Sequence, residues 1–463
     1  MKSTSLGRGS PTEIDGAGSV APTRFRFVII GLLFLMAVVN YVDRGALSYA
    51  SEEIISKYGF SKAEWGSVLG YFGYGYMFGA ICGGALSDHW GPRRVWIYAG
   101  LVWSLFEIAT AFAGEIGLSV LGGSALAGFA TLRILFGFAE GPAFSIINKT
   151  VSGWAAPRER ALLSSFALAS TPFGAMITAP ITVGLLVWSG SWRLTFCILG
   201  VASIALLYFF SRIFTDRPEQ CPRVNAAELA QIREASPAQK SQEAGQGASR
   251  PSWLAFFASR TLVLNAIGYF SFLYVTFLLL TWTPKYLQNQ FHYSLSSLSY
   301  IGMIPWIGSC VAVLVGGRLS DFILEKTGSL KIARSWFAAG SLLLAGLCFL
   351  AIPTATTATG VIALMTLANA LNTLPNAVYW IVVLDTAPKS RTGAYSGTTH
   401  FIANISSVVA PTLTGHLVNL HGYNSMFLAA GTVSLTGMLA MLLVQPGVFR
   451  RASTSRKLSA VNS

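Results

Sequence analysis

The chain carries about twelve apolar runs, each close to 20 residues long, and these runs restrict its fold more than any other feature. A helix needs about 20 apolar residues to cross the hydrocarbon core of a bilayer. Only 11% of the 463 residues are charged, against about 25% in soluble proteins. We therefore predict an all-α membrane protein with twelve transmembrane helices. The runs lie near residues 26–46, 64–86, 94–113, 124–148, 161–187, 193–213, 262–283, 297–322, 333–352, 359–384, 394–418 and 425–445.

Lysine and arginine residues predict the orientation in the membrane. About 26 of the 32 lie in the two tails, in the segment 214–258 or in alternate loops, and about four lie in the loops on the other side. Because cytoplasmic loops are enriched in these residues, we place both termini and residues 214–258 in the cytoplasm. We expect the protein to lie in the inner membrane of the cell. The net charge of +13 is then explained by orientation and by contact with anionic lipid, without a nucleic-acid partner.

Motifs for cofactors and catalysis are lacking in the sequence. The five cysteines are scattered, with no CxxC pair, so neither a disulfide framework nor a metal site is expected. There is no catalytic triad, phosphate-binding loop or dinucleotide fingerprint. We expect neither an enzyme nor an ATP-driven carrier, and no cofactor.

Three sequence matches predict a duplicated architecture. Residues 156–160 resemble 387–391, and residues 179–184 resemble 410–415, both at an offset of 231 residues. Residues 83–88 resemble 316–321 at an offset of 233. Two six-helix halves in the same orientation around a central cavity explain this register. We predict a disordered cytoplasmic tail at 1–24, a first half at 25–213, a cytoplasmic linker at 214–258, a second half at 259–446 and a cytoplasmic tail at 447–463.

Four ionisable residues interrupt the apolar runs: Asp43, Arg44, Arg133 and Glu140. A charge at the centre of a bilayer costs at least about 2.5–3.5 kcal/mol, so such residues usually face a water-filled path, an ion or a substrate. On a helix, Arg44 shares a face with Asn40, four residues earlier, while Asp43 is rotated by about 100°. Arg44 can therefore face a cavity while Asp43 meets a neighbouring helix.

The second pair of charges lies on one stripe of one helix. Arg133, Gly137 and Glu140 fall at positions i, i+4 and i+7, which spans about 10 Å along a helix. Glu140 is then close to the middle of the bilayer and Arg133 nearer the outside. A carboxylate in this setting changes its protonation according to whether an arginine is free or holds a substrate anion. Anion binding and protonation then favour each other, and this linkage is reciprocal.

The segment 84–94 resembles the signature of the major facilitator superfamily between its second and third spans. The one departure is His89, where Arg or Lys is usual. The resemblance implies the twelve-helix fold of that superfamily and a conformational latch in which an aspartate at a helix end holds basic groups in one state and releases them in another. The latch residues are Gly84, Asp88, Gly91, Arg93 and Arg94.

Two further segments resemble the anion:cation symporter family within that superfamily: residues 40–44 (NYVDR) and 133–142 (RILFGFAEGP). That family includes transporters of galactonate, glucarate and hexuronates. The resemblance implies proton-coupled symport of an organic anion into the cell by alternating access, powered by the proton gradient. It implies that Asp43 and Glu140 accept protons, that Arg44 binds substrate and that Arg133 is an electrostatic partner.

Each of these roles has a structural alternative. Arg133 can be a purely structural partner of a carboxylate, and Asp43 can act as a gate residue. The second half lacks matching charges at the 231 offset, so it is expected to supply neutral contacts. Asn404 can bind substrate or bond another helix, and the aromatic candidates can serve packing instead. The predicted substrate contacts besides Arg44 are Tyr41, Tyr76, Asn404, Tyr274, Tyr379 and Trp380.

The sequence of the fifth span bears on which organic anion is the substrate. Sugar-acid members often place a glutamine there, whereas this chain reads Ala-Ser-Thr-Pro-Phe at 169–173. We predict a sugar acid such as an aldonate or uronate as the substrate, with another small carboxylate or an aromatic carboxylate as the alternative. An exporter or exchanger of amphipathic compounds and a non-transporting sensor are the other classes considered. We expect a monomer.

Overall fold

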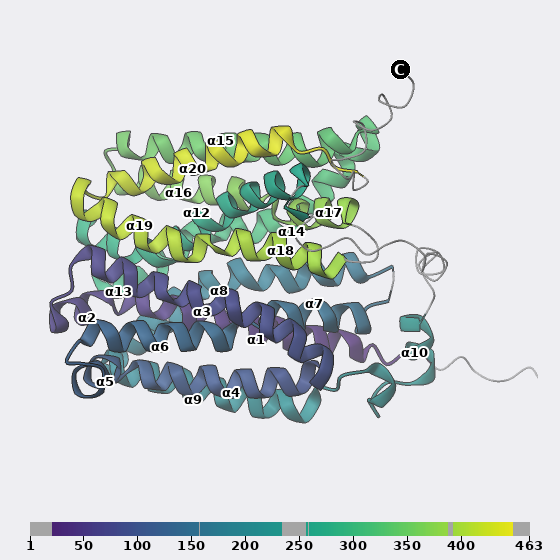
Figure 1. The fold of residues 1–463 in the computed structure, drawn as a ribbon, viewed down its shortest axis with the longest axis horizontal. Helices are drawn as coiled ribbons and strands as arrows, with labels where there is room; N and C mark the ends of the chain where they lie inside the picture. The colour runs from purple at the N-terminus through teal and green to yellow at the C-terminus, as the bar shows by residue number, and fades with distance from the viewer. Residues whose placement is uncertain (1–20, 157, 234–255, 258, 388–391, 448–463) are drawn as a thin grey trace, which may run out of the picture.

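A computed structural model describes residues 21–156, 158–233, 256–257, 259–387 and 392–447. Residues 1–20 of the tail predicted to be disordered, 1–24, lie outside the described residues. Within them the chain is helical, and no strand is present. Figure 1 shows the helices side by side, with those of the first half (purple to blue) gathered in one layer and most of those of the second half (green to yellow) in the other.

The first half runs from α1 to α9, and a short connecting segment follows it. Its helices are α1 (Phe25–Tyr49), α2 (Ser51–Tyr58), α3 (Lys62–Trp90), α4 (Pro92–Thr110), α5 (Ala113–Val120), α6 (Ala125–Glu140), α7 (Ala143–Trp154), α8 (Arg160–Ser189) and α9 (Trp192–Ile213). The connecting segment contains η1 (Pro218–Gln220) and α10 (Ala226–Arg233).

The second half runs from α12 to α20. Its elements are α12 (Arg260–Phe291), α13 (Leu295–Ile301), α14 (Ile304–Thr327), η3 (Lys331–Trp336), α15 (Phe337–Ala351), η4 (Ile352–Thr354), α16 (Ala358–Thr373), α17 (Asn376–Thr386), α18 (Thr392–Asn404), α19 (Ser406–His421) and α20 (Asn424–Leu443). Every predicted apolar run coincides with one of these helices or with a broken pair of them.

Ten of the described helices or helix pairs are long and apolar enough to cross a membrane, and α4 with α5 forms an eleventh candidate bent by 79°. The twelfth predicted span is α3, which is 29 residues long but is not among these candidates. Its sequence is rich in Gly and Tyr, which lowers its hydropathy. The glycines serve packing: a Cβ at Gly75 would lie 1.8 Å from the Ile134 carbonyl oxygen of α6. Small residues of this kind allow close helix contact within a membrane.

The two halves repeat one packing detail. A proline breaks the fourth span of each half, with Pro142 between α6 and α7 and Pro375 between α16 and α17. In the first half a Cβ at Gly83 would meet Pro142 at 2.3 Å, and in the second half a Cβ at Gly316 would meet the Leu374 carbonyl oxygen at 1.8 Å. Gly83 and Gly316 are related by the 233-residue offset of the sequence repeat.

We call the end of the bundle where α1 begins and α20 ends the terminal face, and the other end the opposite face. Figure 1 places α10 at the terminal face and α2, α5 and α13 at the opposite face. Near the opposite face the two halves touch backbone to backbone, since a Cβ at Gly66 of α3 would lie 2.8 Å from the Gly415 Cα of α19. An ion pair joins the halves there too, with 2.8 Å between Lys285 Nζ of α12 and Glu52 Oε2 of α2.

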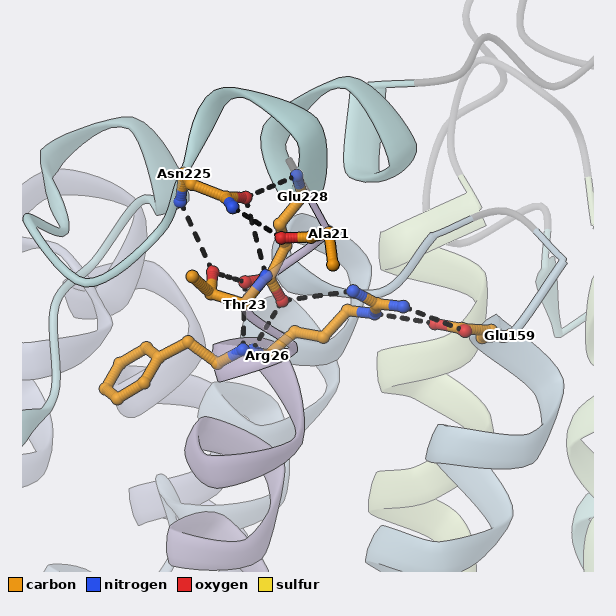
Figure 2. A network of polar contacts seen from close by, with 7 residues as sticks. Ala21, Thr23, Arg26, Glu159, Asn225 and Glu228 are labelled. Carbon is orange, nitrogen blue, oxygen red and sulfur yellow. Dashed lines mark hydrogen bonds and ion pairs between the residues drawn. The ribbon is translucent and has the colours of Figure 1, made fainter. Parts of the chain in front are cut away.

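At the terminal face the connecting segment holds the start of α1 (Figure 2). Glu228 of α10 accepts hydrogen bonds from the Thr23 hydroxyl and from the backbone N–H groups of Phe25 and Arg26. Arg26 also pairs with Glu228 at 3.0 Å and with Glu159 at 2.7 Å. Burial raises the pKa of Glu228, but these hydrogen bonds outweigh that effect and hold its pKa below the usual range. The connecting segment is therefore attached to the first half.

Candidate functional site

A fully buried ion pair lies at the centre of the first half. The Arg44 guanidinium of α1 donates to Glu140 Oε2 at the end of α6, at 3.1 Å from Nη2 and 3.3 Å from Nε. The Arg44 side chain is 3% exposed and that of Glu140 0%. Arg44 Nη2 also donates to Asn40 Oδ1 at 3.0 Å, as the shared helix face predicted.

Aromatic rings surround the Arg44 guanidinium. Its Cζ lies 4.7 Å from the Tyr41 ring centroid, 4.6 Å from that of Phe72 and 4.7 Å from that of Tyr76. Arginine is attracted to the faces of aromatic rings, most strongly where water is excluded. The rings therefore replace part of the hydration that a buried cation loses and fix the position of the guanidinium.

Arg44 lines a cavity between the two halves. The cavity encloses about 540 Å³, counting space open to solvent. It extends from Arg44 towards the terminal face, since Asn148 lies six residues before the terminal end of the span Ala125–Trp154 and Leu168 lies within the first third of α8. The first half contributes Tyr41, Arg44, Tyr76, Phe144, Asn148, Leu168 and Thr171, and the second half contributes Tyr269, Phe272, Leu273, Thr276, Phe277, Asn376, Trp380, His400 and Asn404.

The predicted contacts of the second half divide into two groups. Trp380 and Asn404 line the cavity, although the Asn404 amide donates to the His400 carbonyl oxygen at 2.8 Å. Tyr379 lies behind the lining and stacks on Tyr269 with 5.3 Å between ring centroids. Tyr274 is fully buried away from the cavity. The lining stripe of α12 passes through Leu273 and Thr276, so a residue at 274 is rotated about 100° from it.

Asp43 and Arg133 also lie behind the cavity lining. Asp43 turns to α9, where its Oδ2 accepts a hydrogen bond of 3.1 Å from the Ser203 hydroxyl, so it meets a neighbouring helix as the spacing predicted. The expected pairing of Arg133 with a carboxylate is not present at ion-pair distance among the described residues. Its guanidinium lies over the rings of Phe72 and Phe136, 5.1 and 5.2 Å from their centroids.

The sequence interpretation did not include the buried charges of Glu107 and Lys285. Glu107 of α4 is 0% exposed and belongs to the predicted apolar run 94–113. A charged residue within that run could have indicated a functional site, but no recognisable motif surrounds it. Lys285 of α12 is 3% exposed. The second half therefore also carries a buried charge, which reaches Glu52 across the interface at the opposite face and does not line the cavity.

The predicted latch residues lie together at the terminal face, with partners that the sequence did not indicate. Asp88 Oδ1 accepts from Lys149 Nζ of α7 at 2.8 Å. Arg93 donates its backbone N–H to Asp216 Oδ1 at 2.7 Å and its side chain to the Ser211 carbonyl oxygen at 2.6 Å. Gly91 has φ +82°, which favours glycine, and Gly84 and the exposed Arg94 complete the set.

Metal binding has no support in the described part of the chain. No group of three or more His, Cys, Asp or Glu side chains there could hold an ion. The five cysteines are all free thiols.

An all-helical bundle of two halves, with a cavity between them and charges buried beside it, defines a membrane transport protein rather than an enzyme. The family model described as Major Facilitator Superfamily matches residues 33–411. The chain belongs to the major facilitator superfamily.

Several similar proteins are named as transporters of organic acids, most of them sugar acids. It is 32% identical over 436 residues to a hexuronate transporter of Bacillus subtilis (strain 168), covering 92% of this chain and 96% of that protein. It is 29% identical to a probable galactarate/D-glucarate transporter of Escherichia coli (strain K12), covering 90% and 94%. A probable sulfoacetate transporter of Cupriavidus necator is also 29% identical, with 91% and 94% covered. The resemblance found in the sequence is confirmed.

The fold has a solved counterpart in a bacterial homologue of the human lysosomal transporter Spinster, in an inward-facing and occupied conformation. The TM-score is 0.69 and the sequence identity 15%, with 91% of this chain and 97% of that chain covered. At this identity the likeness concerns the fold alone.

Proposed function

We propose that this protein is a secondary transporter that carries a small organic anion into the cell together with protons, by alternating access. The observation that carries the proposal is the Arg44–Glu140 ion pair, buried at the wall of a cavity shared by both halves. A guanidinium is suited to bind a carboxylate, because its planar donors match the two carboxylate oxygens.

Competition for Arg44 couples the two solutes. In this conformation Glu140 occupies the guanidinium that a substrate carboxylate would use. A proton on Glu140 removes its negative charge and releases Arg44 for the substrate. Binding of the anion then favours protonation by the same factor by which protonation favours binding. Asp43 is assigned the role of a second proton acceptor behind the cavity.

The contacts between the halves support an inward-facing state. The halves meet near the opposite face through Gly66 and Gly415 and through Lys285 and Glu52, while the cavity extends towards the terminal face. The distribution of basic residues favours a cytoplasmic terminal face, and we place the protein in the inner membrane on this basis and that of its proposed role in uptake. In the outward-facing state these contacts break and the halves close at the terminal face, where the latch lies. The two states together give alternating access.

The cavity lining fits a polar acid. Asn376, Asn404 and Thr171 supply amide and hydroxyl groups that can bond the hydroxyls of an aldonate or uronate. A second candidate, an aromatic or less hydroxylated acid, is favoured by the rings of Tyr269 and Trp380 beside them. The names of the similar proteins favour the sugar acid.

Uptake by purified protein in proteoliposomes tests the proposal. The panel comprises radiolabelled D-glucuronate, D-galactarate, D-galactonate and sulfoacetate, with benzoate for the aromatic class. An imposed pH gradient, acidic outside, is expected to drive accumulation of at least one acid above its equilibrium level. Uptake that ignores the gradient for every acid would contradict proton coupling.

A further inference from the structure

Glu107 is a buried carboxylate to which the competition for Arg44 assigns no role. It lies on α4 with 0% exposure, and neither of its oxygens has a hydrogen-bond partner among the described residues. The charged groups near enough to act on it electrostatically are Asp43 from α1 and Arg133 and Glu140 from α6. On α9 the neighbouring polar group is the Ser203 hydroxyl, which bonds Asp43.

Charges in this cluster do not balance when all of them are ionised. Three carboxyl groups, Asp43, Glu107 and Glu140, share the interior of the first half with two guanidinium groups, Arg44 and Arg133. Glu140 is the one carboxylate of the three with an ion-pair partner in the described structure. Burial of an ionised carboxylate without donors is so unfavourable that the group takes a proton instead. With all five groups ionised the cluster has a net charge of −1. One bound proton makes it neutral.

Depth in the bundle distinguishes Glu107 from Glu140. Glu107 lies three residues before the end of α4 at Thr110, which is within one helical turn of the opposite face. Glu140 lies near the middle of its span, which runs over Ala125–Trp154. Arg133 lies two turns of α6 before Glu140, at a depth between the two carboxyl groups, and is near enough to both to act on them electrostatically.

We propose that Glu107 is a proton-binding residue of the transport cycle, which takes a proton arriving at the opposite face and passes it to Glu140 through the Asp43–Arg133 cluster. This inference rests on the proposed proton symport. In the transfer an O–H bond at Glu107 breaks and an O–H bond forms at the receiving carboxylate, so no other reactant is consumed. Arg133, which has no ion-pair partner in the described part of the chain, stabilises whichever carboxylate is left charged.

Glu107→Gln tests this role because it removes the titratable oxygen and keeps the side-chain volume. We measure proton-driven accumulation of D-glucuronate in proteoliposomes, or of the panel acid with the largest uptake, and counterflow of the same acid without a gradient. Coupling between two ligands typically corresponds to about 5–150-fold, so accumulation is expected to fall about ten-fold while counterflow stays within about two-fold of wild type. Glu107→Asp is expected to restore accumulation with a displaced pH profile.

The matched control is Glu53→Gln, which changes an exposed glutamate of α2 at the same face and is expected to leave both activities unchanged. Wild-type accumulation in Glu107→Gln overturns the role of Glu107, as does equal loss of accumulation and counterflow. If Glu107→Gln does not fold, Glu107→Asp decides, since an unchanged pH profile in that variant also overturns it. A wild-type protein that ignores the pH gradient instead refutes the proposed symport itself.

Discussion

Replacing Glu140 by glutamine removes the charge that competes with substrate for Arg44 and changes little else in size. The two hydrogen bonds to Oε2, at 3.1 and 3.3 Å, involve two charged groups. Hydrogen bonds to charged groups contribute about 1.5–3 kcal/mol each. An anion that no longer displaces the carboxylate is expected to bind Arg44 at least about ten-fold more tightly at neutral pH, which corresponds to about 1.4 kcal/mol.

The pH dependence of binding is the more specific readout. In the wild type, affinity for D-glucuronate should fall as pH rises, because Glu140 regains its charge and competes for Arg44. In Glu140→Gln this dependence should be lost or strongly reduced. Isothermal titration of the purified proteins at pH 6 and pH 8 measures both affinities. In proteoliposomes the variant should keep counterflow and lose accumulation driven by a pH gradient.

Two results would refute the competition. A variant that binds the anion with the wild-type pH dependence would show that Glu140 does not compete for the arginine. Equal loss of counterflow and accumulation would make Glu140 a structural or ligand-binding residue. The exposed Glu53→Gln serves again as the control for a lost surface charge.

Three other predictions follow from described contacts. Arg44→Ala should abolish anion binding and destabilise the protein by about 3–5 kcal/mol, because it leaves the Glu140 carboxylate buried and unpaired; preserved affinity in titration would remove Arg44 from the substrate site. A double-mutant cycle of Glu52→Gln and Lys285→Gln should give a coupling of about 1 kcal/mol at most in thermal unfolding, since Glu52 is 58% exposed, and zero coupling would mean that the pair adds nothing to closure. Because the pKa of Glu228 is lowered in the fold, its contribution to stability should be present above the unfolded pKa of about 4.3 and lost as pH falls through the lower folded pKa. Protection of the amides of residues 23–26 from hydrogen exchange, relative to their intrinsic rate at each pH, should fall over that acid range and be low already at neutral pH in Glu228→Gln; unchanged protection would contradict the role of this contact.

The spans could be predicted from the sequence because each apolar run must form a helix within a bilayer. The pairing of Arg44 with Asn40 and the turn of Asp43 towards α9 followed from helical spacing alone. Both depend on positions within one helix, where geometry is fixed by the backbone.

Contacts between helices could not be predicted in the same way. Whether Arg133 reaches a carboxylate depends on how α6 is placed against α1 and α4, which a single sequence does not encode in a local pattern. Tyr274 directly follows Leu273 of the lining stripe of α12, and the rotation of about 100° between neighbouring residues turns it out of the cavity. Glu107 belongs to no motif, and its importance emerges only from the charges that surround it.

The contact of Gly66 with Gly415 has a consequence for how the two halves move. Attraction between packed backbone atoms weakens within about 1 Å of separation, so a joint without side chains has no partly open arrangement that keeps its contacts. An alanine at Gly66 would meet the α19 backbone and hold the halves apart. If the halves move as proposed, the opposite face is expected to act as a seal with only two positions, open and closed, because the two glycines meet without side chains between them.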